Sequence, residues 1–327
     1  MKAVLVSEPG GPEKLELVEL PEPPPGPGEV AIEIHASALN RADLLQRRGL
    51  YPPPAGTTEI LGLECAGVVS ALGPGCSGQA RIGERVMVLL GGGGYAERVV
   101  VPEALTMKIP DALSFEQAAA IPEAFLTARE ALFAAGKLGS SESVLIHAAA
   151  GGVGSAAVQL AHSHGARVFA TAGTAAKCQW VQALGADRVV DYKSQDFAAV
   201  IKAETAGRGV DVILDFVGAA YAERHAACLA LRGRQVLIGV LGGAEAKINL
   251  GRLLQRRQSL VGVVMRSRET LEKIELTRAF EQSTLPLFAD GRLKPLVDSV
   301  FPLSEVARAH QRMESNENLG KIVLKVR

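Results

Sequence analysis

The stretch SVLIHAAAGGVGSAAVQLAH, Ser143 to His162, gives the strongest indication of the fold of this protein. An apolar run is followed by small residues from Ala148 to Gly154, interrupted only by Val153, and then by a segment with helical periodicity. A strand that ends in a glycine turn and continues into a helix presents backbone amides together with the positive end of the helix. This arrangement predicts a binding site for a pyrophosphate.

The dinucleotide fingerprint places glycine at the turn, at the closest approach of the phosphate, and where helix and strand pack. Those positions hold Ala149, Gly151 and Gly154, with Gly152 and Val153 between the last two. Only the first departs from the pattern, and alanine adds one methyl group, which narrows the turn without filling it. Glycine turns also join strands to helices for packing alone, but this one follows the first strand of a βα series. That setting favours a dinucleotide.

The end of the next strand distinguishes between the two nicotinamide dinucleotides. A carboxylate there would accept hydrogen bonds from the ribose hydroxyls of NAD and would repel the extra phosphate of NADP. From Thr171 to Lys177 the sequence reads TAGTAAK, with a hydroxyl at Thr174, an ammonium group at Lys177 and no acidic residue. An ammonium group attracts a phosphate, so we expect NADPH. The alternative for Lys177 is a solvated position on a helix.

Strands and helices alternate from about Ala118 onward. The strands are continuously apolar, which is typical of parallel strands that are buried on both faces and connected by helices. We therefore expect a doubly wound, three-layer α/β domain. Its expected strands are 143–148, 167–173, 188–192, 210–216 and 234–241, and its expected helices are 155–166, 175–186, 196–205 and 221–231.

The first 120 residues follow a different pattern. Short apolar runs such as EVAIEIHASAL and CAGVVSAL are separated by glycine and proline clusters, which is typical of an antiparallel barrel. The C-terminal part contains a helical stretch, RETLEKIELTRAFEQSTLPLFAD, and a final strand-like KIVLKVR. This tail of about 60 residues is small for a third domain, so we expect it to complete the first one.

Composition favours a small, neutral ligand. Lys plus Arg and Asp plus Glu both number 35, and this balance argues against nucleic acid or an anionic membrane as the main partner. The uncharged window 144–161 has a glycine-rich centre and no second span follows it, so we expect no membrane helix. The cysteines, Cys65, Cys76, Cys178 and Cys228, are scattered, which favours a reducing, cytoplasmic location.

The sequence also resembles a known family nearly end to end. It is similar to the medium-chain dehydrogenases/reductases and, within them, to the zinc-independent quinone oxidoreductases. The matching stretches are GGPEKLEL, ASALNRADLLQRRGLYPPP, ILGLECAGVVSALGPGC, EQAAAIPEAFLTA, VLIHAAAGGVGSAAVQLA, TAGT, VILDFVG and NLGKIVL. The resemblance implies a GroES-like, β-barrel-type catalytic domain from residues 1–120 and 268–327. A Rossmann domain from 121–267 would interrupt it, with NADPH bound in the cleft between the two.

The resemblance further implies which residues face the nicotinamide. Zinc-dependent relatives carry a cysteine and a histidine where this sequence has Asn40 and Leu63, so we expect no metal site. By the same match Asn40, Asp43 and Tyr51 are the catalytic candidates, with an amide and a phenol that can bind a carbonyl oxygen. Two alternatives stay open. Asn40 and Asp43 can cap the helix that follows them, and Tyr51 can simply pack a loop.

Cofactor contacts beyond the glycine turn are implied by the same resemblance. They are Gly173, Thr174, Lys177, Tyr192, Leu241, Gly242, Gly243, Val264, Met265, Arg266 and Asn318. A member of this family that the sequence resembles in particular is more basic and polar just after position 174, where this chain has Ala175 and Ala176. The strength of the NADPH preference is therefore left open.

The activity implied by the resemblance is NADPH-dependent reduction of quinones, with ortho-quinones as expected acceptors. A quinone needs a hydride equivalent and protons on its oxygens, and water can supply those protons, so no dedicated acid is required. One alternative is an enone or enoyl-thioester reductase, which benefits from a fixed acid such as Tyr51. Another is a non-enzymatic NADPH-binding protein, as in lens crystallins of this group. The sequence does not decide whether electrons move in pairs or singly.

The stretch QSLVGVVMR, residues 258–266, is apolar and follows a polar segment. We expect it to be an edge strand that pairs with its copy in a homodimer. The alternative is a strand that is covered within its own chain.

Overall fold

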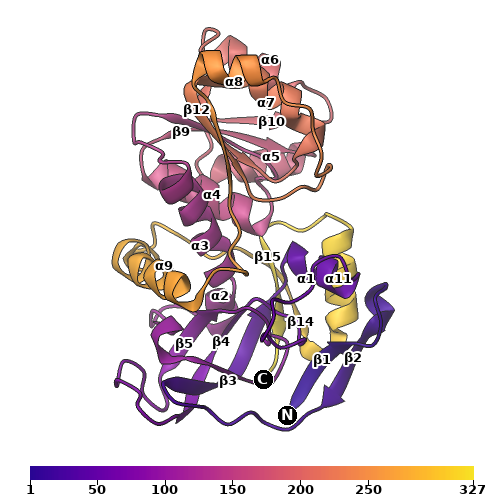
Figure 1. Cartoon of the computed structure of the whole chain (residues 1–327), viewed down its shortest axis with the longest axis vertical. Helices are drawn as coiled ribbons and strands as arrows, with labels where there is room; N and C mark the ends of the chain where they lie inside the picture. Colours follow the sequence, from indigo (N-terminus) through magenta and orange to yellow (C-terminus); the bar gives the residue numbers. More distant parts are fainter. The chain divides into compact units, whose positions relative to one another are not determined.

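The computed structural model describes all 327 residues, which form two compact units. Unit 1 comprises Met1–Leu126 and Met265–Arg327, and unit 2 comprises Thr127–Val264. Both chain ends lie in unit 1 (Figure 1). None of the helices combines the length and the apolar character needed to cross a bilayer.

The division differs from the expected boundaries at residues 120 and 267 because the segments flanking unit 2 pack within unit 1. The Phe125 ring lies edge-on against Phe288, with ring centres 4.8 Å apart. On the other side, the Arg266 guanidinium donates to the Gly91 carbonyl oxygen at 2.8 Å. These contacts extend unit 1 by several residues at each junction.

Unit 1 is built on a seven-stranded sheet. The strand order is β14-β15-β3-β4-β5-β7, and β6 also pairs with β3. The strand β15 pairs antiparallel with β3, with Val323 opposite Ala38, so the C-terminal tail shares a sheet with the N-terminal part (Figure 1). The strands are β3 (Glu29–Ala38), β4 (Glu64–Leu72), β5 (Arg85–Leu89), β6 (Arg98–Pro102), β7 (Met107–Lys108), β14 (Val297–Pro302) and β15 (Lys321–Lys325).

The remaining elements of unit 1 surround this sheet. A separate two-stranded sheet pairs β1 with β2 in antiparallel register. Neither β2 nor the amphipathic helix α11 is among the expected elements, since both are short and lie in segments interrupted by polar residues. The elements are β1 (Lys2–Val6), β2 (Leu15–Glu19), α1 (Arg41–Arg47), α2 (Phe115–Ala119), α3 (Pro122–Arg129), α9 (Thr270–Ser283), α10 (Pro286–Ala289) and α11 (Val306–Glu314).

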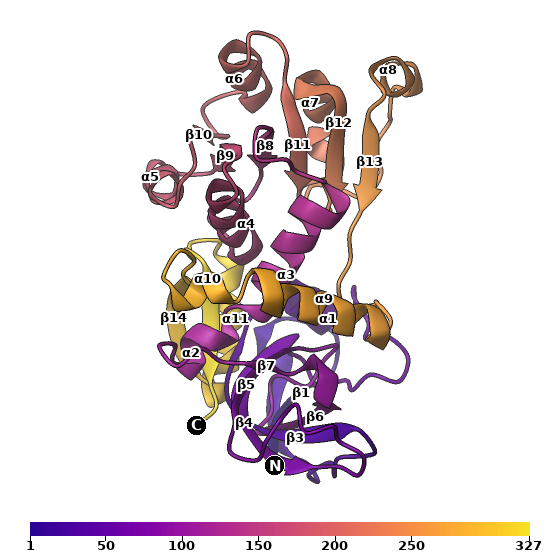
Figure 2. The ribbon, with the colours of Figure 1, turned by 90° about the vertical axis from the view of Figure 1, so that its left-hand side faces the viewer.

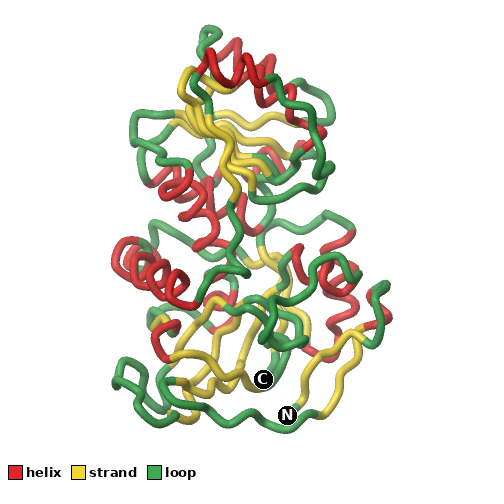
Figure 3. Tube along the Cα trace, viewed as in Figure 1, coloured by secondary structure: helices red, strands yellow, loops and turns green.

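Unit 2 contains a six-stranded parallel sheet in the order β10-β9-β8-β11-β12-β13 (Figure 2). The predicted doubly wound sheet is confirmed, and helices flank its strands (Figure 3). The helices α6 and α7 pack around the fully buried Phe197. The elements are β8 (Ser143–Ile146), α4 (Gly152–Ser163), β9 (Arg167–Ala172), α5 (Ala175–Ala183), β10 (Arg188–Asp191), α6 (Phe197–Glu204), β11 (Val210–Asp215), α7 (Ala222–Cys228), β12 (Leu229–Leu237), α8 (Leu250–Arg256) and β13 (Ser259–Gly262).

One expected helix is wrong at its end. The pattern predicts a helix over 221–231, but α7 stops at Cys228 because Leu229 already pairs with Val210 of β11. The strand then bulges, since the next paired residue of β12 is Arg234. Arg232 has a φ of +60° inside this bulge. Pairing with a distant strand therefore overrides local helical preference.

Candidate active site

In unit 2, the segments expected to bind a dinucleotide lie at the carboxyl ends of the parallel strands. The glycine turn follows β8, Gly173 and Thr174 follow β9, Tyr192 follows β10, and the loop 241–243 follows β12. The order of the strands places the switch point between β8 and β11. Ligands of doubly wound sheets bind outside the carboxyl ends of the strands at such a point. The structure therefore brings these predicted residues to one edge of the sheet.

The glycine turn packs helix α4 directly against the end of β8. A methyl carbon at Gly154 would lie 2.7 Å from the Ala149 Cα and closer still to the Ala148 carbonyl oxygen. At Gly151 it would lie 3.3 Å from that same oxygen, with no other atom near. Gly151 is the N-cap of α4, and the first amides of a helix have no intrahelical acceptor. Gly152, Val153 and Gly154 form that first turn, so the residues present fit a pyrophosphate.

Ala149 has a different part in this turn. It is fully buried, and its N–H donates to the Thr171 carbonyl oxygen at 3.1 Å. The preceding Ala148 has a φ of +47°, in the left-handed region that L-residues seldom adopt. The Ala149 amide therefore links the glycine turn to β9 and is not available to a ligand.

At the end of β9, Thr174 caps helix α5. Its Oγ1 accepts from the Lys177 backbone N–H at 3.2 Å. The Tyr192 side chain covers Gly173, where a methyl carbon would lie 2.6 Å from the Tyr192 hydroxyl oxygen. A carboxylate that sequence reasoning missed stands beside them: Asp191 ends β10 in register with Ala172 of β9. The sequence stretch RVVDY contains this carboxylate, but the stretch forms β10, whereas the cofactor prediction rests only on the residues at the end of β9.

The loop after β12 is fastened to the loop after β11. The Gly242 N–H donates to the Val217 carbonyl oxygen at 2.7 Å, and the Ala219 N–H donates to that of Gly243 at 2.9 Å. Gly243 has a φ of +118°. Leu241, at the tip of this loop, is 60% exposed. Hydrogen bonds therefore join these two loops into one structural unit at the carboxyl ends of the strands.

Unit 1 contains a buried polar cluster, the Glu64 cluster, formed by Leu39, Asn40, Glu64 and Lys321. The Lys321 ammonium donates to Glu64 Oε1 at 2.7 Å, to Asn40 Oδ1 at 2.6 Å and to the Leu39 carbonyl oxygen at 2.7 Å. Asn40 Nδ2 in turn donates to Glu64 Oε1 at 2.9 Å. Both ends of the Asn40 amide are therefore engaged within the protein, and the side chain is held in one orientation. Sequence reasoning missed Glu64 and Lys321, which lie in the matched stretches ILGLECAGVVSALGPGC and NLGKIVL.

Asp43 caps helix α1. Its carboxylate accepts from the Asn40 backbone N–H at 2.7 Å, from the Tyr95 hydroxyl at 3.0 Å and from the Gly62 N–H at 3.3 Å. Burial raises the pKa of Asp43 to about 6, and these hydrogen bonds oppose the rise only in part. The contacts of Asp43 therefore agree with the alternative that it caps the helix. The Asn40 side chain instead makes its hydrogen bonds within the Glu64 cluster.

Tyr51 lies against the Arg266 side chain. The guanidinium carbon is 5.3 Å from the centre of the Tyr51 ring, and Nη1 donates to the Tyr51 carbonyl oxygen at 3.3 Å. Arg266 also donates to Gln46 Oε1 at 2.7 Å, so its guanidinium is satisfied within unit 1. The Tyr51 hydroxyl makes no hydrogen bond to the protein, and burial raises its pKa, so it keeps its proton.

The last three predicted cofactor residues are arranged as follows. Val264 ends unit 2 and is 46% exposed, whereas Met265 begins unit 1 and is buried. Asn318 is buried as well, and its Nδ2 donates to the Gly320 carbonyl oxygen at 2.9 Å. Of these three residues, only Val264 exposes a large part of its surface.

The residues at the position of a catalytic zinc do not fit that metal. Asn40 is bound within the Glu64 cluster and Leu63 is a buried hydrocarbon. The chain contains no group of three or more His, Cys, Asp or Glu side chains arranged so that it could hold a metal ion. Zinc requires such a set of nitrogen, sulfur or carboxylate ligands.

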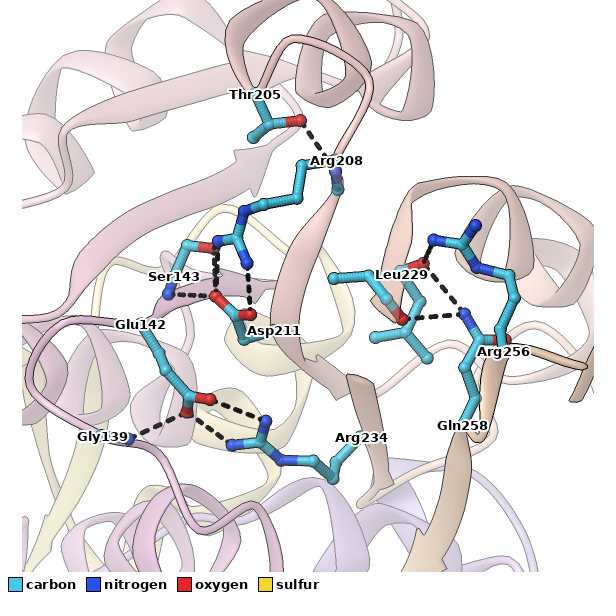
Figure 4. A network of polar contacts seen from close by, with 12 residues as sticks. Gly139, Glu142, Ser143, Thr205, Arg208, Asp211, Leu229, Arg234, Arg256 and Gln258 are labelled. Carbon is cyan, nitrogen blue, oxygen red and sulfur yellow. Dashed lines mark hydrogen bonds and ion pairs between the residues drawn. The ribbon is translucent and has the colours of Figure 1, made fainter. Parts of the chain in front are cut away.

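A cavity of about 340 Å³ lies at the amino ends of the strands of unit 2. The ion pairs beside it are complete: Arg208 binds Asp211 at 2.7 Å and Arg234 binds Glu142 at 2.6 Å (Figure 4). None of the predicted site residues lines this cavity. Its lining is Ser141, Glu142, Ser143, Arg167, Glu204, Thr205, Ala206 and Arg208.

Comparison with known proteins agrees with both units. Residues 26–111 match the alcohol dehydrogenase GroES-like domain, and residues 152–281 match the domain described as zinc-binding dehydrogenase. The synaptic vesicle membrane protein VAT-1 homolog of Rattus norvegicus is 35% identical over 336 residues, which cover 96% of this chain and 81% of the relative.

Solved structures are similar over the whole chain. The Escherichia coli quinone oxidoreductase complexed with NADPH is 33% identical, with a TM-score of 0.90 and complete coverage of both chains. The CurK enoyl reductase is also 33% identical, with a TM-score of 0.88 over 99% of this chain and 98% of that one. With this fold and these relatives, the chain belongs to the medium-chain dehydrogenase/reductase family and, within it, to the quinone oxidoreductase group.

Proposed function

We propose that this oxidoreductase is an NADPH-dependent quinone reductase that works without zinc. The observation that carries the proposal is the glycine turn at the switch point of the sheet, where Gly151 leaves room for a pyrophosphate and Gly154 lets α4 pack against the end of β8. The similarity to a quinone oxidoreductase that binds NADPH supports the acceptor class and the cofactor. Bound NADPH would supply the hydride equivalent.

The protein would contribute mainly orientation and hydrogen bonding. Gly151 to Gly154 would hold the diphosphate on the helix end, and Thr174 and Lys177 would lie toward the adenosine phosphate. The Tyr51 hydroxyl is the one candidate donor with no partner in the protein, so it can donate to a carbonyl oxygen that gains negative charge. The Asn40 amide would act through its fixed orientation, because the Glu64 cluster occupies both of its ends.

The first experiment is a panel of quinones and enones assayed with NADPH and NADH, following cofactor absorbance. We expect rapid oxidation of NADPH by ortho-quinones. A flat trace across the panel, with NADPH binding still present in calorimetry, would contradict the proposal and favour a non-enzymatic binding protein. If calorimetry gives no heat of binding with NADPH, the proposed cofactor is wrong.

An enone or enoyl reductase is the second candidate, supported by the similarity to CurK and by the unpartnered Tyr51 hydroxyl. Protonation of carbon requires a positioned acid, whereas quinone oxygens can take protons from water. In Tyr51→Phe we therefore expect quinone turnover to fall by less than about tenfold, corresponding to one lost hydrogen bond. If enones are the true substrates, their turnover in this variant should fall by about 10²-fold or more.

We also propose a homodimer formed through β13. This strand is at the edge of its sheet, and Leu260 on it is 45% exposed. Light scattering should give twice the chain mass, and Leu260→Lys should shift the protein toward monomer. A monomeric unmodified protein would contradict the proposed homodimer.

We also propose a cytoplasmic location. All four cysteines are free thiols, which is typical of a reducing compartment.

A further inference from the structure

We propose that Thr171, His147, His225, Gln235 and Asp215 form a hydrogen-bonded relay that positions the dinucleotide-binding edge of unit 2, an inference that rests on the proposed NADPH binding. The five residues come, in the same order, from β9, the end of β8, α7, β12 and β11. None of them is expected to contact the cofactor. They are positioning residues, which act through the loops that they hold.

The relay is continuous through the core. His147 Nδ1 lies 2.9 Å from Thr171 Oγ1, and His147 Nε2 lies 2.9 Å from His225 Nε2. On its other side, Gln235 Nε2 bridges His225 Nδ1 and Asp215 Oδ2, two atoms that are 3.4 Å apart. Both imidazole rings are completely buried. Two histidines joined through facing nitrogens in a dry interior must share one hydrogen between those nitrogens.

The neighbouring Gln235 determines which tautomers are compatible. Its Nε2 donates to Asp215 Oδ2 at 2.8 Å and lies 3.1 Å from His225 Nδ1. An amide nitrogen is a donor, so His225 Nδ1 must accept, and His225 then carries its hydrogen on Nε2. That hydrogen is donated to His147 Nε2, which leaves the His147 hydrogen on Nδ1, directed at Thr171. Both rings are therefore neutral and have opposite tautomers.

The surroundings favour neutral rings. Aromatic rings of Phe197 and Tyr221 pack on His147, with centres 4.8 and 5.0 Å away. The only charged or titratable side chains that face the pair are Asp215, Tyr221 and Arg224, whose guanidinium lies over the Tyr221 ring at 4.1 Å. Burial lowers the pKa of His147, and Arg224 lowers it further. A second proton on either ring would put two donors face to face.

The relay ends on the segments that form the binding edge. Asp215 Oδ1 accepts from the Val217 and Gly218 N–H groups at 2.8 and 2.9 Å. Those residues form the loop that holds Gly242. At the other end, the Thr171 carbonyl oxygen accepts from the Ala149 N–H behind the glycine turn. The relay thus connects the loops after β8, β11 and β12.

The test uses substitutions of His147 in the full-length protein. His147→Leu removes both hydrogen bonds, whereas His147→Asn keeps a donor close to the position of Nδ1 and so keeps the bond to Thr171. We expect the Leu variant to raise the Kd and the KM for NADPH about tenfold, with kcat at saturating NADPH changed less than about threefold. The Asn variant should recover part of the affinity. The control is His164→Gln, an exposed histidine at the end of α4, which should leave both constants unchanged.

Nitrogen-15 NMR of the histidine rings tests the tautomers without any substitution. We expect a neutral Nδ1–H ring for His147 and a neutral Nε2–H ring for His225. Any other pair of tautomers overturns the proposal, as does unchanged NADPH affinity in a folded His147→Leu variant. If the unmodified protein binds no NADPH, the proposed function itself fails, and the tautomers still report on the relay.

Discussion

The two glycines at the start of α4 should respond to the same substitution in different ways. Gly154→Ala would place a methyl carbon 2.7 Å from the Ala149 Cα. The obstructing atoms belong to the backbone, so no side chain can rotate away. The closest backbone atom, the Ala148 carbonyl oxygen, would lie only 2.4 Å away, so the first turn of α4 must move by about 1.0 Å to reach an ordinary contact of 3.4 Å. Overpacking of this kind costs about 1–3 kcal/mol, which lowers Tm by about 2–4 °C for each kcal/mol.

Gly151→Ala should leave stability almost unchanged. Its methyl carbon would lie 3.3 Å from one carbonyl oxygen, and its φ of −82° suits alanine. The methyl group would, however, occupy the space of the closest phosphate, so we expect the Kd for NADPH to rise at least about tenfold. Gly139→Ala is the control, because its methyl carbon would meet only the Glu142 side chain, at 3.6 Å.

Thermal unfolding and NADPH calorimetry on these three variants check the prediction. The expected result is lower stability for Gly154→Ala, weaker binding with normal stability for Gly151→Ala, and neither change for Gly139→Ala. Normal NADPH affinity in Gly151→Ala would refute the phosphate site at this turn. Stability of Gly154→Ala equal to that of the control would refute the packing argument.

Three further predictions follow from buried charges and from the adenosine end of the cofactor site. Lys321→Met leaves the buried Glu64 carboxylate without its cation, which should cost about 3–5 kcal/mol in urea unfolding, and Lys321→Met/Glu64→Leu should cost less than the sum of the two single changes. Burial lowers the pKa of His225 to about 4 and that of His310 to about 3, so the unfolded chain takes up protons first as pH falls. Each ring should therefore contribute a loss of stability below about pH 6.5 of up to about 1.4 kcal/mol per pH unit. Burial raises the pKa of Asp43 to about 6 and that of Glu123 to about 8, and these two carboxyls oppose the loss. His310→Gln should remove the contribution of its ring, and a pH profile in chemical unfolding that is unchanged in this variant would contradict this. Lys177→Ala should raise the Kd for NADPH about tenfold and leave that for NADH unchanged, with Lys202→Ala as control; equal effects on both cofactors would remove Lys177 from phosphate recognition.

The alternation of strands and helices in unit 2 could be predicted from the sequence because it depends on local information. Continuous apolar runs mark strands buried on both faces, and glycine at 151 and 154 marks the turn where helix and strand approach. The end of α7 could not be predicted in this way. Leu229 leaves the helix to pair with Val210, a partner that no local pattern identifies.

The parallel sheet, the glycine turn and the family could all be predicted from the sequence, because periodicity, turn residues and long matching motifs are visible along the chain. The partners of the buried polar side chains, in contrast, are set by the tertiary structure. It joins Asn40 to Glu64 and Lys321. It also joins His147 to His225 and, through Gln235, to Asp215. A buried polar group must find its partner wherever the fold brings one close, and distance along the chain gives no measure of that proximity.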